Sequence, residues 1–466
     1  MTYYSPFEKD FADLAVADLS ALRAASEGWY IEYKREVPNA NGIAKSLAAF
    51  ANSYGGWLFY GVDEASKENP AAGAFPGISM GEADASLQRI RQAAANCINP
   101  APYFETRLLQ GPNADLGLDE GQAILVVRVP QGINAPYIHK SGQIYRRVAD
   151  GSEPKPENDR FLLDSLFRRS DDLRQQYKDW LARDPELSKA EENSPFLRLM
   201  ITVDPWAERD PWLETDLAGI RDIFNSGAAS LISGLPFDSV HKSPRGFIAR
   251  QIHTNDPSNL GLTWRFRQTL TGDVIVPLKV EAPREPFELL ELDGYQHIRR
   301  YIGILQKGRH ARPQIIDLNL LFNLLTGIVE RQEQLMAAAG WQGEWYFKVR
   351  LLNVWRTIPF LDVPIVLDEF EAHGIPLCLD ETVTVLDGSD PETLLRVDRR
   401  LDIESPHARV LLQALALFEP IASAWGISAW MPVGEDQPAY YQQLQLAGAR
   451  ALKVQANRTP DTNKDR

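Results

Sequence analysis

The sequence predicts an α/β protein, in the broad sense that includes α+β arrangements, with a mixed sheet in its amino-terminal domain. Three observations favour this fold. Residues 29–36 alternate apolar and polar side chains, which is typical of a strand. Residues 43–54 carry apolar side chains at helical spacing. Residues 57–62 are apolar on both faces, as in a central strand, and a second α/β region follows downstream.

The first of these segments predicts a strand with two different faces. Trp29, Ile31 and Tyr33 form its apolar face, and we expect Glu32 on the opposite, charged face. The helix that follows has its core face at Ile43, Leu47, Phe50 and Tyr54. Gly55 and Gly56 end this helix, where a residue at positive φ is needed.

Further elements complete the amino-terminal domain. We expect a Pro- and Gly-containing loop at 69–77, a helix at 82–97, and strands at 103–109, 124–129 and 144–148. One or two helices are predicted at 161–181, with Asp159 as an N-cap. The predicted organisation is a helical lead-in at 1–26, a domain at 27–183, a linker at 184–194, an α/β region at 195–454 and a disordered tail at 455–466.

The second region repeats the mixture of strands and helices. Strands are predicted at 196–203 and 346–355, and a hairpin at 262–280 turns around residues 271–273. A long helix at 317–339 begins at the N-cap Asp317 and stops at Gly340. Another helix begins at Ser405, with Pro406 in its first turn.

Composition excludes several functional classes. The chain has 466 residues, two cysteines and a net charge of −14, so it has no disulfide framework, no Cys-rich zinc site and no overall basic footprint for nucleic acid. No secretory signal and no membrane-spanning apolar run occur, and we expect a cytoplasmic protein. No Gly-Lys-Ser/Thr P-loop occurs either, so no nucleotide cofactor is expected, although glycine turns such as Asn52 with Gly55 and Gly56 can hold phosphate.

Four acidic residues are the candidates for chemistry. Glu27 and Glu32 are five residues apart, and Asp63 and Glu64 follow the first buried strand. The predicted geometry brings Glu32 near Asp63 or Glu64 at one end of the sheet, where clustered carboxylates need a shared proton or a cation such as Mg²⁺ or Mn²⁺. The alternative is structural, with Glu32 paired to Lys34 on the strand surface and Asp63 capping a turn.

Basic residues suggest contacts with nucleic acid despite the negative net charge. The strand at Tyr145 carries Arg146 and Arg147, which point to opposite faces, so one of them can contact phosphate. Tyr137 and His139 lie just upstream and are candidates for stacking on a base. Lys34 is a further candidate contact, and the alternative for both arginines is a structural salt bridge with an acid.

Several short motifs resemble the Schlafen-type AlbA domain, a family associated with DNA binding. They are Ser26-Glu27, Glu32-Tyr33-Lys34, Ala49-Phe50-Ala51-Asn52, Gly55-Gly56, Gly61-Val62-Asp63 and Tyr145-Arg146-Arg147, within residues 20–168. The resemblance implies DNA or RNA binding. It also implies, by similarity to relatives that cut RNA, a metal-binding set of Glu27, Glu32 and one of Asp63 or Glu64.

The sequence therefore predicts a nucleic-acid-binding protein. One alternative is an endonuclease that depends on Mg²⁺ or Mn²⁺ and acts on RNA or single-stranded DNA. The other is a non-catalytic scaffold, in which the AlbA-like domain makes a homo-oligomer and the region at 195–454 binds another protein. Retention of nucleic acid, and cleavage only with a divalent ion, distinguish these three functions.

Overall fold

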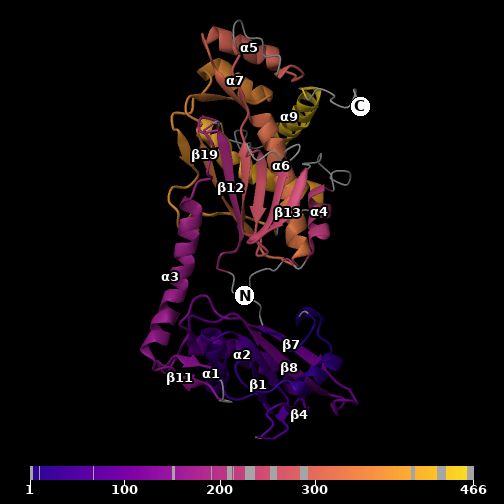
Figure 1. The fold of residues 1–466 in the computed structure, drawn as a ribbon. Helices are drawn as coiled ribbons and strands as arrows, with labels where there is room; N and C mark the ends of the chain where they lie inside the picture. Colours follow the sequence, from indigo (N-terminus) through magenta and orange to yellow (C-terminus); the bar gives the residue numbers. More distant parts are fainter. Residues whose placement is uncertain are drawn as a thin grey trace. The chain divides into compact units, whose positions relative to one another are not determined.

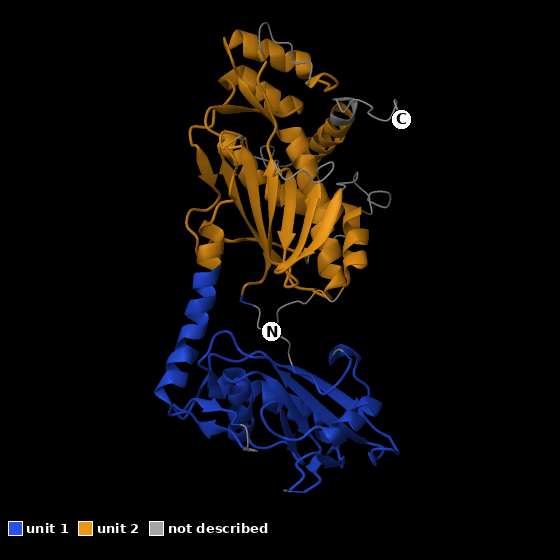
Figure 2. Ribbon diagram, in the orientation of Figure 1, with its two compact units in different colours: residues 1–176, 206–209 blue, residues 177–205, 210–466 orange. Residues whose placement is uncertain are grey.

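The chain folds into two compact units (Figure 1). The computed structural model describes residues 4–9, 11–66, 68–148, 153–189, 191–206, 213, 215–225, 237–251, 260–283, 292–399, 405–427 and 437–458. The first unit comprises residues 1–176 and 206–209, and the second comprises residues 177–205 and 210–466 (Figure 2).

The amino-terminal unit begins with two short 3-10 helices, η1 (Phe11–Asp13) and η2 (Val16–Ala24). Its strands are β1 (Ile31–Lys34), β2 (Gly56–Tyr60), β3 (Asp63–Glu64), β4 (Ala72–Ala74), β5 (Ile78–Ser79), β6 (Ile98–Asn99), β7 (Glu105–Gln110), β8 (Gln122–Val129), β9 (Ile138–His139), β10 (Tyr145–Arg146) and β11 (Lys155–Pro156). Its helices are α1 (Ala40–Asn52), α2 (Met80–Cys97) and the first part of α3 (Arg160–Ala182).

A mixed five-stranded sheet forms the middle layer of this unit. Its order is β1-β2-β8-β5, with β7 also paired to β8; β1 and β2 are parallel and the other pairs are antiparallel. Alternate residues of β2 pack into two different hydrophobic cores, one on each face of the sheet. Leu58 and Tyr60 pack with α1 and α2, while Trp57 and Phe59 pack with the lead-in at residues 7–25. The predicted central strand is confirmed, because all five residues of β2 are buried.

Other details of this unit differ from the sequence prediction. The strand predicted at 29–36 is shorter, since β1 covers only Ile31–Lys34. The predicted loop at 69–77 contains β4, which pairs with β3. Tyr54 was expected in the core face of a helix, but α1 ends at Asn52 and Tyr54 is 51% exposed. Asp159 does cap α3, since its Oδ1 accepts a hydrogen bond from the Phe161 amide at 2.8 Å.

The second unit contains strands and helices in alternation. Its strands are β12 (Phe196–Val203), β13 (Ser239–Ser243), β14 (Gly246–Gln251), β15 (Leu262–Phe266), β16 (Gly272–Pro277), β17 (Val280–Glu281), β18 (Gln314–Asp317), β19 (Trp345–Leu352), β20 (Thr357–Phe360), β21 (Thr382–Thr384) and β22 (Leu395–Val397). Its helices are α4 (Leu217–Asn225), α5 (Ile298–Lys307), α6 (Leu318–Ala338), α7 (Pro364–His373), α8 (Pro406–Ala422) and α9 (Gln437–Arg458), with the short 3-10 helices η5 (Pro391–Thr393) and η6 (Ser423–Trp425).

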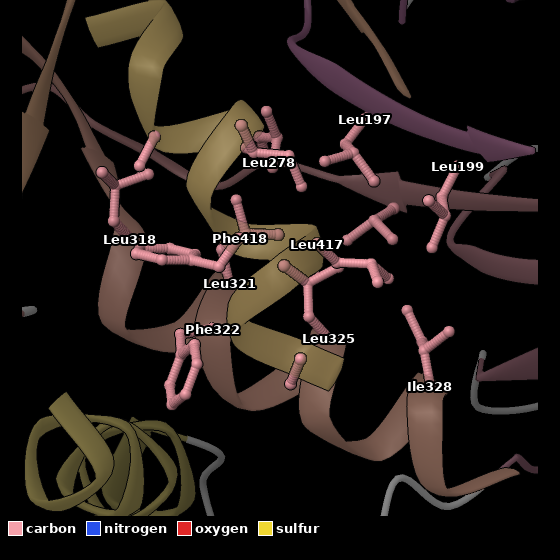
Figure 3. Close-up of a cluster of buried hydrophobic side chains, with 14 of the residues drawn as sticks. Leu197, Leu199, Leu278, Leu318, Leu321, Phe322, Leu325, Ile328, Leu417 and Phe418 are labelled. Carbon is pink, nitrogen blue, oxygen red and sulfur yellow. The ribbon is translucent and has the colours of Figure 1, made fainter. Parts of the chain in front are cut away.

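An antiparallel sheet of eight strands organises this unit, in the order β13-β14-β15-β16-β12-β19-β21 with β22 also paired to β19. One face packs on α6 and α8 (Figure 3). Leu197 and Leu199 of β12 lie opposite Leu325 of α6 and Leu417 of α8 in a single large hydrophobic core. A smaller sheet, β17-β18-β20, alternates in sequence with the later strands of the large sheet, since β19 lies between β18 and β20. Strand β18 leads directly into α6 through Asp317.

Helix ends in the second unit follow the sequence closely. Asp317 caps α6 by accepting hydrogen bonds from the backbone amides of Asn319 and Leu320. Ser405 caps α8 by accepting one hydrogen bond, from the Ala408 amide. The division between units lies inside α3, between residues 176 and 177, whereas the sequence suggested a linker at 184–194. Helix α9 runs to Arg458, so the predicted disordered tail is wrong for residues 455–458; residues 459–466 lie outside the described part.

Candidate nucleic-acid interface

Glu32 lies in a buried charge cluster, and the expectation that it occupies a charged solvent face is wrong. Its side chain is 1% exposed, and its Oε2 lies 3.1 Å from Nη1 of Arg147, whose side chain is fully buried. The Ser46 hydroxyl of α1 donates to Glu32 Oε1 at 2.9 Å, and Lys34 Nζ lies 3.3 Å away. Burial of a carboxylate is tolerated here because the neighbours supply opposite charge and hydrogen bonds.

The Arg147 side chain contacts β1, the segment before β1, and helix α1. Its Nε and Nη2 donate to the Gly28 carbonyl at 3.0 and 2.6 Å, and Nη2 also donates to the Ile31 carbonyl at 3.1 Å. Its guanidinium lies over the ring of Phe50, with 5.0 Å to the centroid. A fully buried guanidinium with these partners does not contact a phosphate from solvent, so the prediction that Arg147 binds nucleic acid is corrected.

The other predicted contact residues are also engaged within the fold. Arg146 forms an ion pair with Glu157 at 2.9 Å, and its side chain is 12% exposed. Tyr137 is fully buried against Gly132, and His139 is 4% exposed with Nδ1 at 2.8 Å from the Ser141 hydroxyl. Neither ring is available for stacking on a base. Lys34 is the most accessible of the predicted set, but it is the residue that pairs with Glu32.

Asn52 has a structural position at the end of α1. Its Nδ2 donates to the carbonyls of Tyr137 and Tyr145 at 2.9 and 3.0 Å, and its Oδ1 accepts from the Tyr137 amide at 2.8 Å. Gly55 follows with φ of 76°, where a Cβ would lie 2.8 Å from two backbone atoms of residues 129 and 131. At Gly56 a Cβ would lie 2.3 Å from the ring of Phe50. These three residues therefore fix the turn between α1 and β2.

The four predicted acids do not gather into one group. Asp63 pairs with Arg35 at 2.7 Å, and Glu32 pairs with Arg147. Glu27 and Glu64 form a carboxyl pair, in which Glu27 Oε1 also accepts from the Tyr33 amide. Lys34, the partner of Glu32, is near enough to lower the pKa of Glu27. Burial and a hydrogen bond shared with Glu64 raise the pKa of Glu27 to about 8. Within the described ranges no three His, Cys, Asp or Glu side chains are grouped as a metal site.

Lys45 and Lys140 lie near His139. The sequence analysis did not connect these two lysines. Lys45 of α1 has its Nζ 5.3 Å from the ring centroid of Tyr145, and that ring meets His139 edge-on at 5.5 Å. Burial lowers the pKa of His139, and Lys45 and Lys140 lower it further. Neither lysine has an ion pair with a carboxylate in the described part of the chain. Lys45 was missed because only the apolar positions of its helix were interpreted.

Comparison with known protein families identifies one family in the amino-terminal unit. Residues 27–156 match the family described as Schlafen, AlbA_2. This segment is a Schlafen AlbA_2 domain. It contains the Glu32–Arg147 pair, the turn after α1, and both lysines around His139.

No curated protein matches the chain. A solved structure, the DIP2311 protein from Corynebacterium diphtheriae, is similar over 46% of this chain and 40% of that one, with 16% sequence identity and a TM-score of 0.20. The chain thus spans less than half of that protein. Among the described helices, none is long and apolar enough to cross a membrane.

Proposed function

We propose that the AlbA_2 domain binds nucleic acid and that Lys45 and Lys140 contact its phosphates. The observation that carries this proposal is the match of residues 27–156 to a family associated with DNA binding. The two lysines support it, since both act on His139 and neither is neutralised by a carboxylate within the described ranges. Ammonium groups without a carboxylate partner attract phosphate even on a chain with a net charge of −14, because the interaction is local.

Retention of labelled nucleic acid tests this function. The full chain is mixed with tRNA, single-stranded DNA and duplex DNA at low salt, and bound and free species are separated on a native gel. We expect retention by the wild type and clear weakening in the Lys45→Ala/Lys140→Ala double variant. Lys9→Ala is the matched control, because Lys9 is an exposed lysine already paired with Asp18 at 2.8 Å. No retention of any of the three ligands by the wild type would contradict the proposal.

Metal-dependent cleavage is the second candidate, and the Glu27–Glu64 pair favours it. Mg²⁺ is commonly held by one or two carboxylates, with phosphate and water completing its ligands. The pair supplies two such groups, and burial together with the hydrogen bond to Glu64 raises the pKa of Glu27. Glu32 does not complete a three-acid set in this arrangement, since Arg147 and Lys34 already neutralise it.

The same binding reactions test cleavage when Mn²⁺ or Mg²⁺ is added. Products that form with the metal and disappear in Glu64→Gln would support the second candidate. Cleavage by Glu64→Gln at the wild-type rate, or no product with either ion, would leave binding as the function of the domain. Glu36→Gln is the control, because Glu36 is an exposed acid two residues after β1.

A further inference from the structure

Four aromatic rings form a continuous patch on the amino-terminal unit, which we call the aromatic surface: Tyr4, Trp29, Tyr30 and Tyr54. Tyr4 stacks on Tyr30 with ring centroids 4.7 Å apart and an interplanar angle of 23°. Tyr54 lies 6.3 Å from Tyr30 and meets Trp29 edge-on at 5.6 Å. Tyr54 is 51% exposed and Tyr4 is 42% exposed, so ring atoms of the patch face solvent.

The backbone holds these rings in place without a ligand. Tyr54 stands between the end of α1 and the Gly55 turn, where the Gly55 amide donates to the Phe50 carbonyl at 3.0 Å. The Tyr30 carbonyl accepts from the Trp57 amide at 2.7 Å. The indole nitrogen of Trp57 donates to the Tyr4 carbonyl at 3.0 Å. Rings fixed in this way lose little conformational freedom when another flat group stacks on them.

A positive charge lies beside the aromatic surface. The Arg169 guanidinium donates to the carbonyls of Ala51, Gly132 and Asn52, at 3.2, 2.8 and 3.1 Å. It is close enough to Tyr54 for the two side chains to interact electrostatically. Its partners are backbone oxygens, and in the described part of the chain no carboxylate forms an ion pair with it. The charge complements an anionic ligand that crosses the exposed face of Tyr54.

We propose that the aromatic surface stacks unpaired bases of single-stranded nucleic acid, with Tyr54 as its main contact. Every base has a flat π-face, and exposed aromatic side chains near a positive charge are the usual platform for such strands. The bases of a duplex are already stacked on one another, so they do not offer their faces to Tyr54. This inference rests on the proposed nucleic-acid binding and adds to it a preference for single strands.

Binding of a single-stranded oligonucleotide and of its duplex, followed by fluorescence anisotropy, tests the inference. We expect Tyr54→Ala to weaken single-strand binding about tenfold and to leave duplex binding unchanged. Tyr54→Phe keeps the ring and should bind as the wild type does. Tyr103→Ala is the matched control, because Tyr103 is 47% exposed and is not one of the four rings. Thermal unfolding of each variant verifies that the fold is intact.

The outcomes separate this inference from the proposed function. If the wild type binds neither ligand, the proposed function fails and the inference fails with it. If the wild type binds and Tyr54→Ala has unchanged single-strand affinity, only the inference is overturned. Light scattering on the same samples measures whether the aromatic surface binds a second copy of the chain instead. A wild-type dimer that Tyr54→Ala converts to a monomer would assign the aromatic surface to a second copy of the chain and would also overturn the inference.

Discussion

Replacement of Arg147 by methionine separates a structural from a ligand-binding role for this arginine. The change keeps most of the side-chain length but removes the ion pair with Glu32 at 3.1 Å and the donors to the carbonyls of Gly28 and Ile31. Glu32 then stays buried with Lys34 and Ser46 as its remaining partners. Removal of one member of a buried pair typically costs about 3–5 kcal/mol. We expect the unfolding free energy to fall by about the lower value, because Lys34 still places a positive charge beside the Glu32 carboxylate.

The assay for this prediction must distinguish two folded units. Denaturant unfolding is followed by circular dichroism, and hydrogen exchange measured by mass spectrometry on peptides from β1 and α1 assigns the early transition to the amino-terminal unit. Arg35→Met is the matched control. It breaks the Arg35–Asp63 pair, whose side chains are 66% and 30% exposed, and it should cost at most about 1 kcal/mol.

A double variant sharpens the test of the buried pair. Glu32→Gln/Arg147→Met removes the uncompensated carboxylate and should recover part of the lost stability. Wild-type stability of Arg147→Met, together with a weaker dependence of nucleic-acid binding on salt, would refute the reasoning. That result would mean that Arg147 contacts phosphate rather than Glu32.

Two further predictions concern protonation and the turn after α1. The pKa of Glu27 is raised in the folded state from 4.5 to about 8, so the folded protein binds this proton more tightly and stability from this group is lost as pH rises through that interval. Between about pH 5 and pH 8 the unfolding free energy of Glu27→Gln should therefore decrease less with rising pH than that of the wild type. An equal decrease in both proteins would contradict the raised pKa of Glu27. Gly55→Val should cost at least about 1–3 kcal/mol, because φ is 76° and a Cβ meets backbone at 2.8 Å. An unchanged melting temperature for this variant would show that the turn tolerates a side chain.

Local sequence patterns predicted the parts of the fold that depend on neighbouring residues. The buried central strand β2 follows from an apolar run, and the positive φ of Gly55 follows from its place between a helix and a strand. The cap of α6 at Asp317 follows from one polar residue before an apolar helix. Each of these features is decided within about a dozen residues of chain, where periodicity and turn chemistry carry the information.

Features that depend on distant partners were predicted only as alternatives or not at all. A structural salt bridge with an acid was the alternative for Arg146 and Arg147, and both ion pairs occur, but the sequence did not identify the acids. Glu32 and Arg147 are 115 residues apart, so the alternation of β1 gave no sign that an arginine would bury this acid. Tyr54 fits the helical spacing of α1, yet the helix ends two residues earlier and leaves the ring exposed. The boundary inside α3 has no sequence signal either, because one unbroken helix contributes to both units.

The most direct test of the central claim is the salt dependence of nucleic-acid affinity. Binding of a single-stranded oligonucleotide is measured between low and physiological salt for the wild type and for Lys45→Ala/Lys140→Ala. Two lost phosphate contacts should reduce the slope of log affinity against log salt by about 1.4, while Lys9→Ala keeps the wild-type slope. Equal slopes for the double variant and the wild type would contradict the assignment of phosphate to Lys45 and Lys140.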